Sequence, residues 1–125
     1  MNSSQEPAVA AGPVRRFKDP AYVEVAATLG ELRERIDSLD EQIVTLLAQR
    51  AACVRDATRF KRDAFQVAAP ARQAQVFERV RALAAARDSA FPGLPDIVEA
   101  TYRAMVAGFV AAEGQLFHET DTIAP

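Results

Sequence analysis

The chain has 125 residues, of which 50% are hydrophobic, so it is long enough for one domain around a single apolar core. Its 15 Lys and Arg residues and 17 Asp and Glu residues give a net charge of −2 at pH 7, which argues against a nucleic-acid or acidic-membrane binder that depends on bulk positive charge. The single cysteine, Cys53, excludes an internal disulfide, and no zinc-ligand spacing is present.

Residues 1–19, MNSSQEPAVAAGPVRRFKD, mix Ser, Gly, Pro, Ala and charged residues without a period, which predicts a disordered N-terminal tail. This opening has no continuous apolar stretch of the kind that signal peptides contain, and no later run is long and uncharged enough to cross a bilayer. Together with the cysteine usage, these features favour a cytoplasmic protein that binds neither membrane nor nucleic acid.

A long first helix is predicted from Leu29 to Phe60, because apolar residues recur there at alternating intervals of three and four. This spacing forms a heptad seam, and it predicts a helix on the order of 45 to 50 Å long. Thr28 is the expected N-cap, and Glu31 completes a capping box. Cys53 lies in the seam, and we expect it to be a small buried apolar residue.

Two shorter helices are predicted after it, the second from near Pro70 to near Arg87 and the third from about Pro95 to Glu119. The segment 88–95, DSAFPGLP, separates them. The expected buried face of the second helix consists of Val76, Phe77, Val80, Leu83 and Ala84. The predicted fold class is all-α, a three-helix protomer with one long first helix. Because two shorter helices cannot cover so long a seam, the sequence predicts an intertwined helical homodimer.

Three cations of this pattern point to an anionic ligand. Arg50 occupies a seam position, where a buried guanidinium needs either an acidic partner or a ligand anion. Lys61 lies eleven residues later, about 16 Å along the helix axis and on nearly the same side, so the two side chains can grip one small anion. Arg33 lies seventeen residues before Arg50, roughly 25 Å away, and can reach that ligand only from an antiparallel second chain. An interfacial ion pair for Arg50 and a solvated position for Arg33 are the structural alternatives.

Glu113 places a carboxyl on the apolar side of the third helix, four residues from both Phe109 and Phe117. Such a carboxyl either keeps its proton or pairs with one of the cations, and a purely structural pair is the alternative. The residues that together indicate a dianion pocket inside a helical bundle are Arg33, Arg50, Lys61, Arg72 and Glu113.

The stretch ELRERIDSLDEQIVTLLAQRAACVRDATRFK resembles the first helix of the all-helical chorismate mutases and of the related isochorismate pyruvate lyases. That family carries an arginine in an L-R-x-x-I-D-x-L-D start, a second arginine seventeen residues on and a lysine eleven beyond, which fall here on Arg33, Arg50 and Lys61. Its loop arginine corresponds to Arg72, and its Gln-or-Glu position corresponds to Glu113 rather than Gln115. The resemblance covers about residues 29–119.

The resemblance implies a mutase-like helical domain at residues 20–119, followed by a short tail at 120–125. It implies a homodimer with shared active sites, each of which borrows the partner's Arg33. The implied reaction is the conversion of chorismate to prephenate in aromatic amino acid biosynthesis, with no cofactor and no metal. The implied catalytic residues are Lys61, Glu113 and Arg50, and the implied substrate-binding residues are Arg33, Arg50, Lys61, Arg72 and Glu113.

Departures from the mutase pattern leave the lyase reaction, which gives salicylate and pyruvate, as an alternative. The acid that the mutases place three residues before the loop arginine is Ala69 here, and their serine one turn before Glu113 is Phe109. The interval of eleven residues between Lys61 and Arg72 also resembles the lyases. Glu113 favours the mutase, because the lyases resemble one another in having glutamine at that position.

Residues 59–72, RFKRDAFQVAAPAR, interrupt the helical pattern and are predicted to form a lid over the pocket. Lys61 and Arg72 are expected to point into the pocket, whereas Arg59 and Arg62 are expected to face solvent. A non-enzymatic helical dimerisation module, in which Arg50 only fixes the register, is the remaining alternative.

Overall fold

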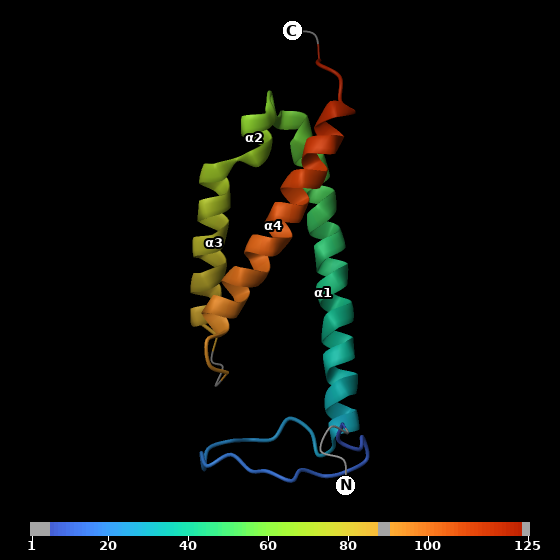
Figure 1. Cartoon of the computed structure of the whole chain (residues 1–125), viewed down its shortest axis with the longest axis vertical. Coiled ribbons are helices and arrows are strands. Elements are labelled where there is room, and N and C mark those ends of the chain that lie inside the picture. Colours follow the sequence, from blue (N-terminus) through green and yellow to red (C-terminus); the bar gives the residue numbers. More distant parts are fainter. Residues whose placement is uncertain (1–5, 88–90, 124–125) are drawn as a thin grey trace. The chain divides into compact units, whose positions relative to one another are not determined.

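The computed structural model describes residues 6–87 and 91–123, and every regular element in these residues is a helix. The elements in chain order are α1 (Leu29–Ala57), the 3-10 helix η1 (Thr58–Phe60), α2 (Ala64–Ala68), α3 (Pro70–Ala85) and α4 (Leu94–His118) (Figure 1). The predicted all-α class is therefore confirmed, and the three predicted helices correspond to α1, α3 and α4. Residues 1–5 and 124–125 of the predicted tails, and residues 88–90 of the predicted break, lie outside the described residues.

The chain forms two compact units, Met1–Ala48 and Gln49–Pro125, and the boundary between them falls inside α1. Within the helices of the described part, no segment is both long enough and apolar enough to span a membrane.

The start of α1, in the first unit, is fixed by the predicted capping box. The Thr28 hydroxyl oxygen accepts a hydrogen bond from the Glu31 N–H at 3.2 Å. The Glu31 carboxylate accepts in return from the N–H of Ala27 at 3.1 Å, one residue before the N-cap. The Gly30 N–H donates to the Val9 carbonyl at 2.9 Å, and a Cβ at Gly30 would lie only 3.1 Å from that oxygen. The segment before α1 is thereby tied to the first turn of the helix.

The seam of α1 within the first unit is exposed. Ile36, Leu39, Ile43 and Leu46 are between 52% and 62% exposed, although their spacing is that of a packed helix face. A row of large apolar side chains on one helix face is the feature that normally contacts another helix.

The end of α1, in the second unit, differs from the sequence-based expectation. The helix ends at Ala57 rather than continuing to Phe60, and the Thr58 hydroxyl bonds back to the Val54 carbonyl at 3.1 Å. The backbone then tightens into η1, and Lys61 follows in an extended conformation, with φ −100° and ψ 138°. Lys61 is therefore the first residue after η1 and is not part of α1. The expectation that it lies on the face of the long helix is wrong.

Residues 63–70 turn the chain from η1 toward α3 through the short helix α2. The Asp63 carboxylate caps α2 by accepting from the Gln66 N–H at 2.9 Å, and the Gln66 side chain accepts from the Arg62 N–H at 2.6 Å. Ala69 ends α2 in the left-handed region, with φ 44° and ψ 61°, and Pro70 begins α3 immediately afterwards. Part of the predicted lid is thus a capped helix.

The core of the second unit forms where α3, α2 and η1 pack against α4. Its most buried apolar residues are Val67, Val80, Ala84 and Val106. Val76 and Phe77 of the expected buried face are half-buried, and two other residues that were expected to be buried are exposed. Leu83 is 43% exposed because α4 covers only one side of α3, and Cys53 is exposed because it lines a cavity instead of the core.

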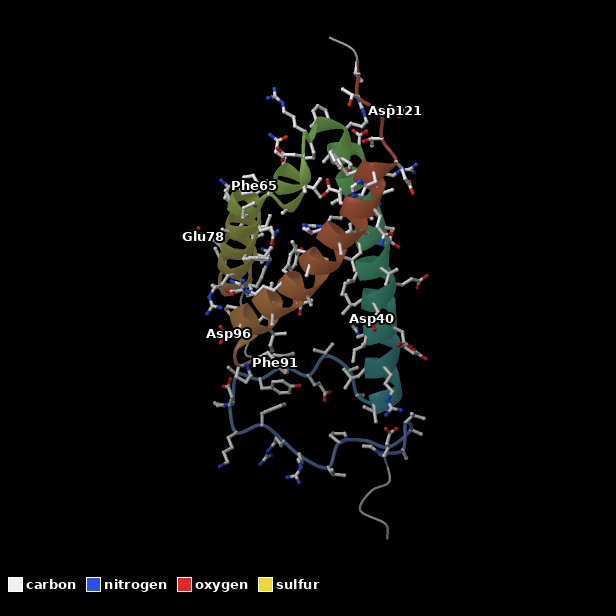
Figure 2. The ribbon with its side chains drawn as sticks, turned by 45° about the horizontal axis from the view of Figure 1, so that its top comes forward. Asp40, Phe65, Glu78, Phe91, Asp96 and Asp121 are labelled. Carbon is white, nitrogen blue, oxygen red and sulfur yellow. The ribbon has the colours of Figure 1, made fainter. Side chains whose placement is uncertain are left out.

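Charged residues link α3 to α4 near the start of α4, where Figure 2 labels Asp96. Arg81 pairs with Asp96 at 2.6 Å and with Glu99 at 3.3 Å, and Arg103 donates to Glu99 at 2.9 Å. Hydrogen bonding from Arg103, followed by the charges of Arg103 and Arg81, lowers the pKa of Glu99. The stabilisation from this carboxylate is present at neutral pH and is lost as the pH falls through its pKa. Because the groups are exposed, each pair contributes little.

Candidate functional site

A cavity of about 320 Å³ lies in the second unit among the end of α1, the α2–α3 junction and α4, and we call it the Glu113 cavity. Its volume falls in the range of small-molecule sites. Four of the five predicted site residues line it, namely Arg50, Lys61, Arg72 and Glu113. Apolar residues that line it as well are Val54, Val67, Val76, Val106, Phe109 and Val110.

Glu113 is the most buried charged residue of this cavity, with 4% of its surface exposed. Its Oε2 accepts hydrogen bonds from the Lys61 ammonium at 3.2 Å and from the Thr58 hydroxyl at 3.1 Å. Both bonds end on Oε2, and the other carboxyl oxygen, Oε1, has no hydrogen-bond partner among the described residues. Lys61 is 21% exposed, so its ammonium pairs with Glu113 while it keeps access to the cavity.

Arg50 is half-buried and lies against two aromatic rings of α4. Its guanidinium carbon is 5.3 Å from the ring centre of Phe109 and 6.0 Å from that of Tyr102. The rings stabilise the cation through their faces and leave its N–H groups free to bond an anion. Across the described part of the chain, Arg50 forms no ion pair, so the acidic partner required by the structural alternative is not found there.

Arg72 lies in the first turn of α3 and is exposed at the edge of the Glu113 cavity. The free N–H groups of this turn and the helix dipole both favour an anion near it. Arg50, Lys61 and Arg72 supply three positive charges to the cavity lining, against one carboxyl from Glu113. The lining therefore has the charge balance that an anionic ligand requires.

Arg33 belongs to the first unit, where it is exposed on α1. Its guanidinium is 3.7 Å from the carboxylate of Glu6, which is itself 85% exposed, so the pair is weak and screened by salt. Arg33 is the one predicted site residue that is not part of the unit containing the Glu113 cavity.

Arg59 and Arg62 are exposed, as the sequence predicted, and Arg59 pairs with Asp56 at 2.8 Å. Lys61 and Arg72 from the same segment both line the cavity. Lys61 and Arg72 thus line the Glu113 cavity and Arg62 does not, whereas Arg59 lines the Arg55 cavity described below. The movement of this segment as a lid stays a prediction.

Two residues that contact the predicted site were not identified from the sequence. Thr58, 3% exposed, binds Glu113, and Tyr102 lies under Arg50. The feature of the sequence that could have identified Thr58 was its position three residues before Lys61. The signal for Tyr102 was its position seven residues before Phe109, which puts both rings on the same face of α4.

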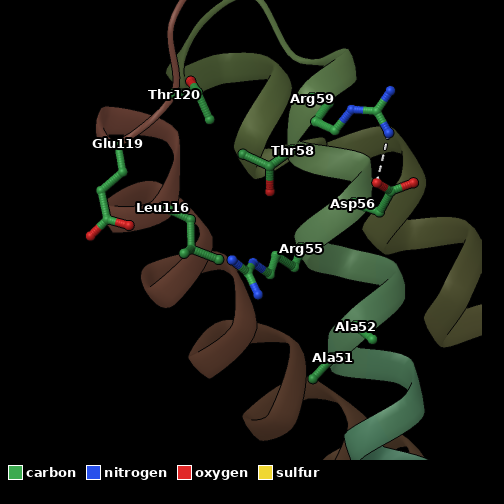
Figure 3. Close-up of a pocket in the computed structure, with 9 residues that line it drawn as sticks. All are labelled: Ala51, Ala52, Arg55, Asp56, Thr58, Arg59, Leu116, Glu119 and Thr120. Carbon is green, nitrogen blue, oxygen red and sulfur yellow. Dashed lines mark hydrogen bonds and ion pairs between the residues drawn. The ribbon is translucent and has the colours of Figure 1, made fainter.

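A second cavity in the same unit, of about 810 Å³, lies between the end of α1 and the end of α4 (Figure 3). We call it the Arg55 cavity, and it is lined by Ala51, Ala52, Arg55, Asp56, Thr58, Arg59, Leu116, Glu119 and Thr120. Thr58 is thus part of the wall of one cavity and bonds to the acid of the other. Residues 6–87 and 91–123 contain no group of His, Cys, Asp and Glu side chains that could hold a metal ion.

The comparison with protein families identifies a match. Residues 32–114 match the family model described as chorismate mutase type II, which covers the greater part of the chain. No curated protein and no solved structure gives a significant match. The matched range contains all five predicted site residues.

Replacing Lys61 with Met should destabilise the protein more than its exposure suggests, because Glu113 would be left as a buried carboxylate without a counter-charge. We expect a loss of about 2 to 3 kcal/mol in the free energy of unfolding at pH 7, somewhat below the usual cost of breaking a fully buried pair. Urea denaturation measures this loss, and Arg62→Met, at an exposed neighbouring position, is the control. Equal losses in the two variants would contradict the prediction.

Proposed function

The chain belongs to the type II chorismate mutase family, and we propose that it rearranges chorismate to prephenate in the Glu113 cavity. The observation that carries the proposal is the pair of Lys61 with the buried Glu113, at 3.2 Å, on the wall of a cavity that Arg50 and Arg72 also line. Family membership supports the class of activity. The assignment of roles to individual residues is our proposal.

Arginine side chains suit the substrate because chorismate carries two carboxylates, which guanidinium groups bind in a bidentate manner. Arg50 is held over the rings of Phe109 and Tyr102 with its N–H groups unused by any acid within the described residues, which supports its role as one clamp. We assign the second carboxylate to the partner's Arg33. We assign Arg72 to positioning the ring of the substrate. Holding both carboxylates keeps the enolpyruvyl side chain folded over the ring, so that little further ordering is needed at the transition state.

The reaction needs no group from outside the substrate, because one carbon–oxygen bond breaks while one carbon–carbon bond forms. Negative charge develops on the ether oxygen as its bond to the ring lengthens. The Lys61 ammonium stabilises that charge, and a preorganised donor in a site with little water is far more effective than one in bulk water. Glu113 assists when it is protonated, by donating a hydrogen bond from Oε1 to the same oxygen.

We propose that two chains form the working unit, since the site needs a second arginine clamp. The exposed seam residues of α1, Ile36, Leu39, Ile43 and Leu46, offer a surface on which another helix can pack. This surface supports the proposed homodimer and the contribution of the partner's Arg33 to each site. Burying four large aliphatic side chains of this kind contributes several kcal/mol per chain, at about 1.5 to 3 kcal/mol for each fully buried side chain.

The lyase reaction on isochorismate is the second candidate function, and two residues of the cavity lining support it. Ala69 and Phe109 line the cavity at the positions where the mutases carry an acid and a serine, so neither supplies a polar group to the ring hydroxyl of chorismate. The same arginine clamps would hold isochorismate, whose hydroxyl lies elsewhere on the ring. The acid at position 113 favours the mutase.

The purified protein should consume chorismate, measured as loss of its ultraviolet absorbance. Isochorismate is assayed in parallel, with salicylate fluorescence as the readout, and a higher kcat/KM for isochorismate would replace the mutase assignment by the lyase. Lys61→Ala should lower kcat for chorismate by about 10² to 10³ because a donor to the developing charge is lost. If neither substrate turns over, and a dicarboxylate transition-state mimic gives no protection against thermal unfolding, the chain is a dimerisation module.

Activity should be higher at mildly acidic pH than above neutrality, because Glu113 donates to the ether oxygen only when it carries a proton. The Glu113→Gln variant keeps a hydrogen-bond donor at every pH, so its kcat should vary much less between pH 5 and 8. Ordinary lysine and arginine side chains do not titrate in this range, so they do not obscure the comparison. The pH dependence of kcat measures this effect. A wild-type profile that is already flat would show that Glu113 has another role.

Mixing two inactive variants should restore activity if the sites are shared between chains. Arg33→Ala and Arg50→Ala are each expected to be inactive, whereas a mixed dimer has one intact site, composed of Arg50 from one chain and Arg33 from the other. Random re-association makes half of the dimers mixed, so about a quarter of the wild-type activity should return. Arg35→Ala, at an exposed position near Arg33, is the control and should stay active alone. No recovery on mixing would rule out sharing.

A further inference from the structure

Thr58 occupies an unusual position for a polar residue, because its hydroxyl is buried against a carboxyl. Only 3% of its surface is exposed, and its Oγ1 lies 3.1 Å from Oε2 of Glu113 and 3.1 Å from the carbonyl oxygen of Val54. These two neighbours come from different helices, α4 and α1. The contact therefore joins the end of α1 to the residue that we place at the reacting atoms.

The hydroxyl has one hydrogen, so it can donate to only one of its two neighbours at a time. Donation to Glu113 is favoured when that group is ionised, since hydrogen bonds to a charged acceptor are stronger than those to a neutral carbonyl. When Glu113 is neutral, Oε2 still accepts from Thr58 and Lys61 if the proton sits on Oε1. A proton on Oε2 would instead compete with both donors. The two contacts together therefore select Oε1 as the oxygen that carries the proton.

We propose that Thr58 is a positioning residue for Glu113, whose carboxyl group it orients so that the protonated Oε1 faces the Glu113 cavity. The inference rests on the proposed function, because it concerns how Glu113 presents its proton to the ether oxygen. Thr58 itself lines the Arg55 cavity rather than the Glu113 cavity, so it acts through Glu113 and does not touch the substrate. Without the hydroxyl, rotation of the carboxyl group exchanges the two oxygens and directs the proton away from the substrate.

The walls of the two cavities carry further charged groups close to this pair. They are Arg50, Lys61 and Arg72 in the Glu113 cavity, and Arg55, Asp56, Arg59 and Glu119 in the Arg55 cavity. On α4 itself, the positions one turn from Glu113 are apolar, at Phe109, Val110, Leu116 and Phe117. Within the described part of the chain, Thr58 and Lys61 are the side chains that bond Glu113 directly.

The test compares Thr58→Val, which keeps the shape of the side chain but removes the hydroxyl, with Thr58→Ser, which keeps the hydroxyl. Thr58→Val should lower kcat for chorismate by a few-fold to about tenfold, the effect of one hydrogen bond to the neutral carboxyl of the reacting form, with KM little changed. Its alkaline loss of activity should also move to higher pH, because the ionised carboxylate loses a donor. Thr58→Ser should keep the wild-type pH profile and most of kcat.

A second comparison excludes a merely structural effect. In the Glu113→Gln background, Thr58→Val should change the pH profile no further, because the titrating group is already gone. Thermal unfolding by circular dichroism shows whether each variant is folded. If Thr58→Val does not fold, the serine variant decides: a pH profile displaced from that of the wild type contradicts the proposal, and an unchanged profile supports it.

A measurement that needs no turnover follows the δ-carbon of Glu113 by ¹³C NMR in protein with labelled glutamate, with Glu113→Gln to assign the signal. The titration midpoint should rise in Thr58→Val and stay in place in Thr58→Ser. A wild type that converts neither substrate overturns the proposed function. A wild type that converts chorismate, with Thr58→Val identical to it in kcat, pH profile and titration, overturns only the role of Thr58.

Discussion

The buried carboxyl of Glu113 is the constraint on which the second unit depends. A carboxylate with 4% exposure is tolerated only when donors replace the water it has lost, and here Lys61 and Thr58 do so through Oε2. To supply them, α1 ends at Ala57, η1 places Thr58 inward, and the extended backbone at Lys61 turns its ammonium toward α4. The irregular end of α1 therefore supplies the hydrogen-bond donors that the buried Glu113 of α4 requires.

The cations of the site are held by different means, and this difference matters for ligand binding. Lys61 is neutralised by Glu113, whereas Arg50 rests on the faces of Phe109 and Tyr102 and keeps its full charge. An arginine supported by rings rather than by an acid need not break an ion pair before it binds a carboxylate. Guanidinium groups also stay charged throughout the physiological range, so the positive charge of Arg50 remains available to an anion at any pH in that range.

Most of the helical framework could be predicted because its signals are local. The heptad spacing located α1, the Thr28 capping box located its first turn, and Pro70 located the start of α3. Cys53 was wrongly expected to be buried, since periodicity reports which face is apolar and not whether another helix covers it. Lys61 was expected on a continuous helix, but α1 ends at Ala57, and Thr58 after it contacts Glu113, 55 positions away. Such long-range contacts leave no periodic trace in a sequence.

Ala69 adopts a left-handed backbone conformation, with φ 44°, where α2 meets α3 on the wall of the Glu113 cavity. Alanine is an uncommon residue in this region, whereas aspartate and asparagine adopt it more readily. The backbone is therefore already shaped to accept a carboxylate at the position where related mutases carry their acid. An aspartate or asparagine at position 69 would therefore fit the existing turn between α2 and α3 and add a polar side chain to the cavity wall.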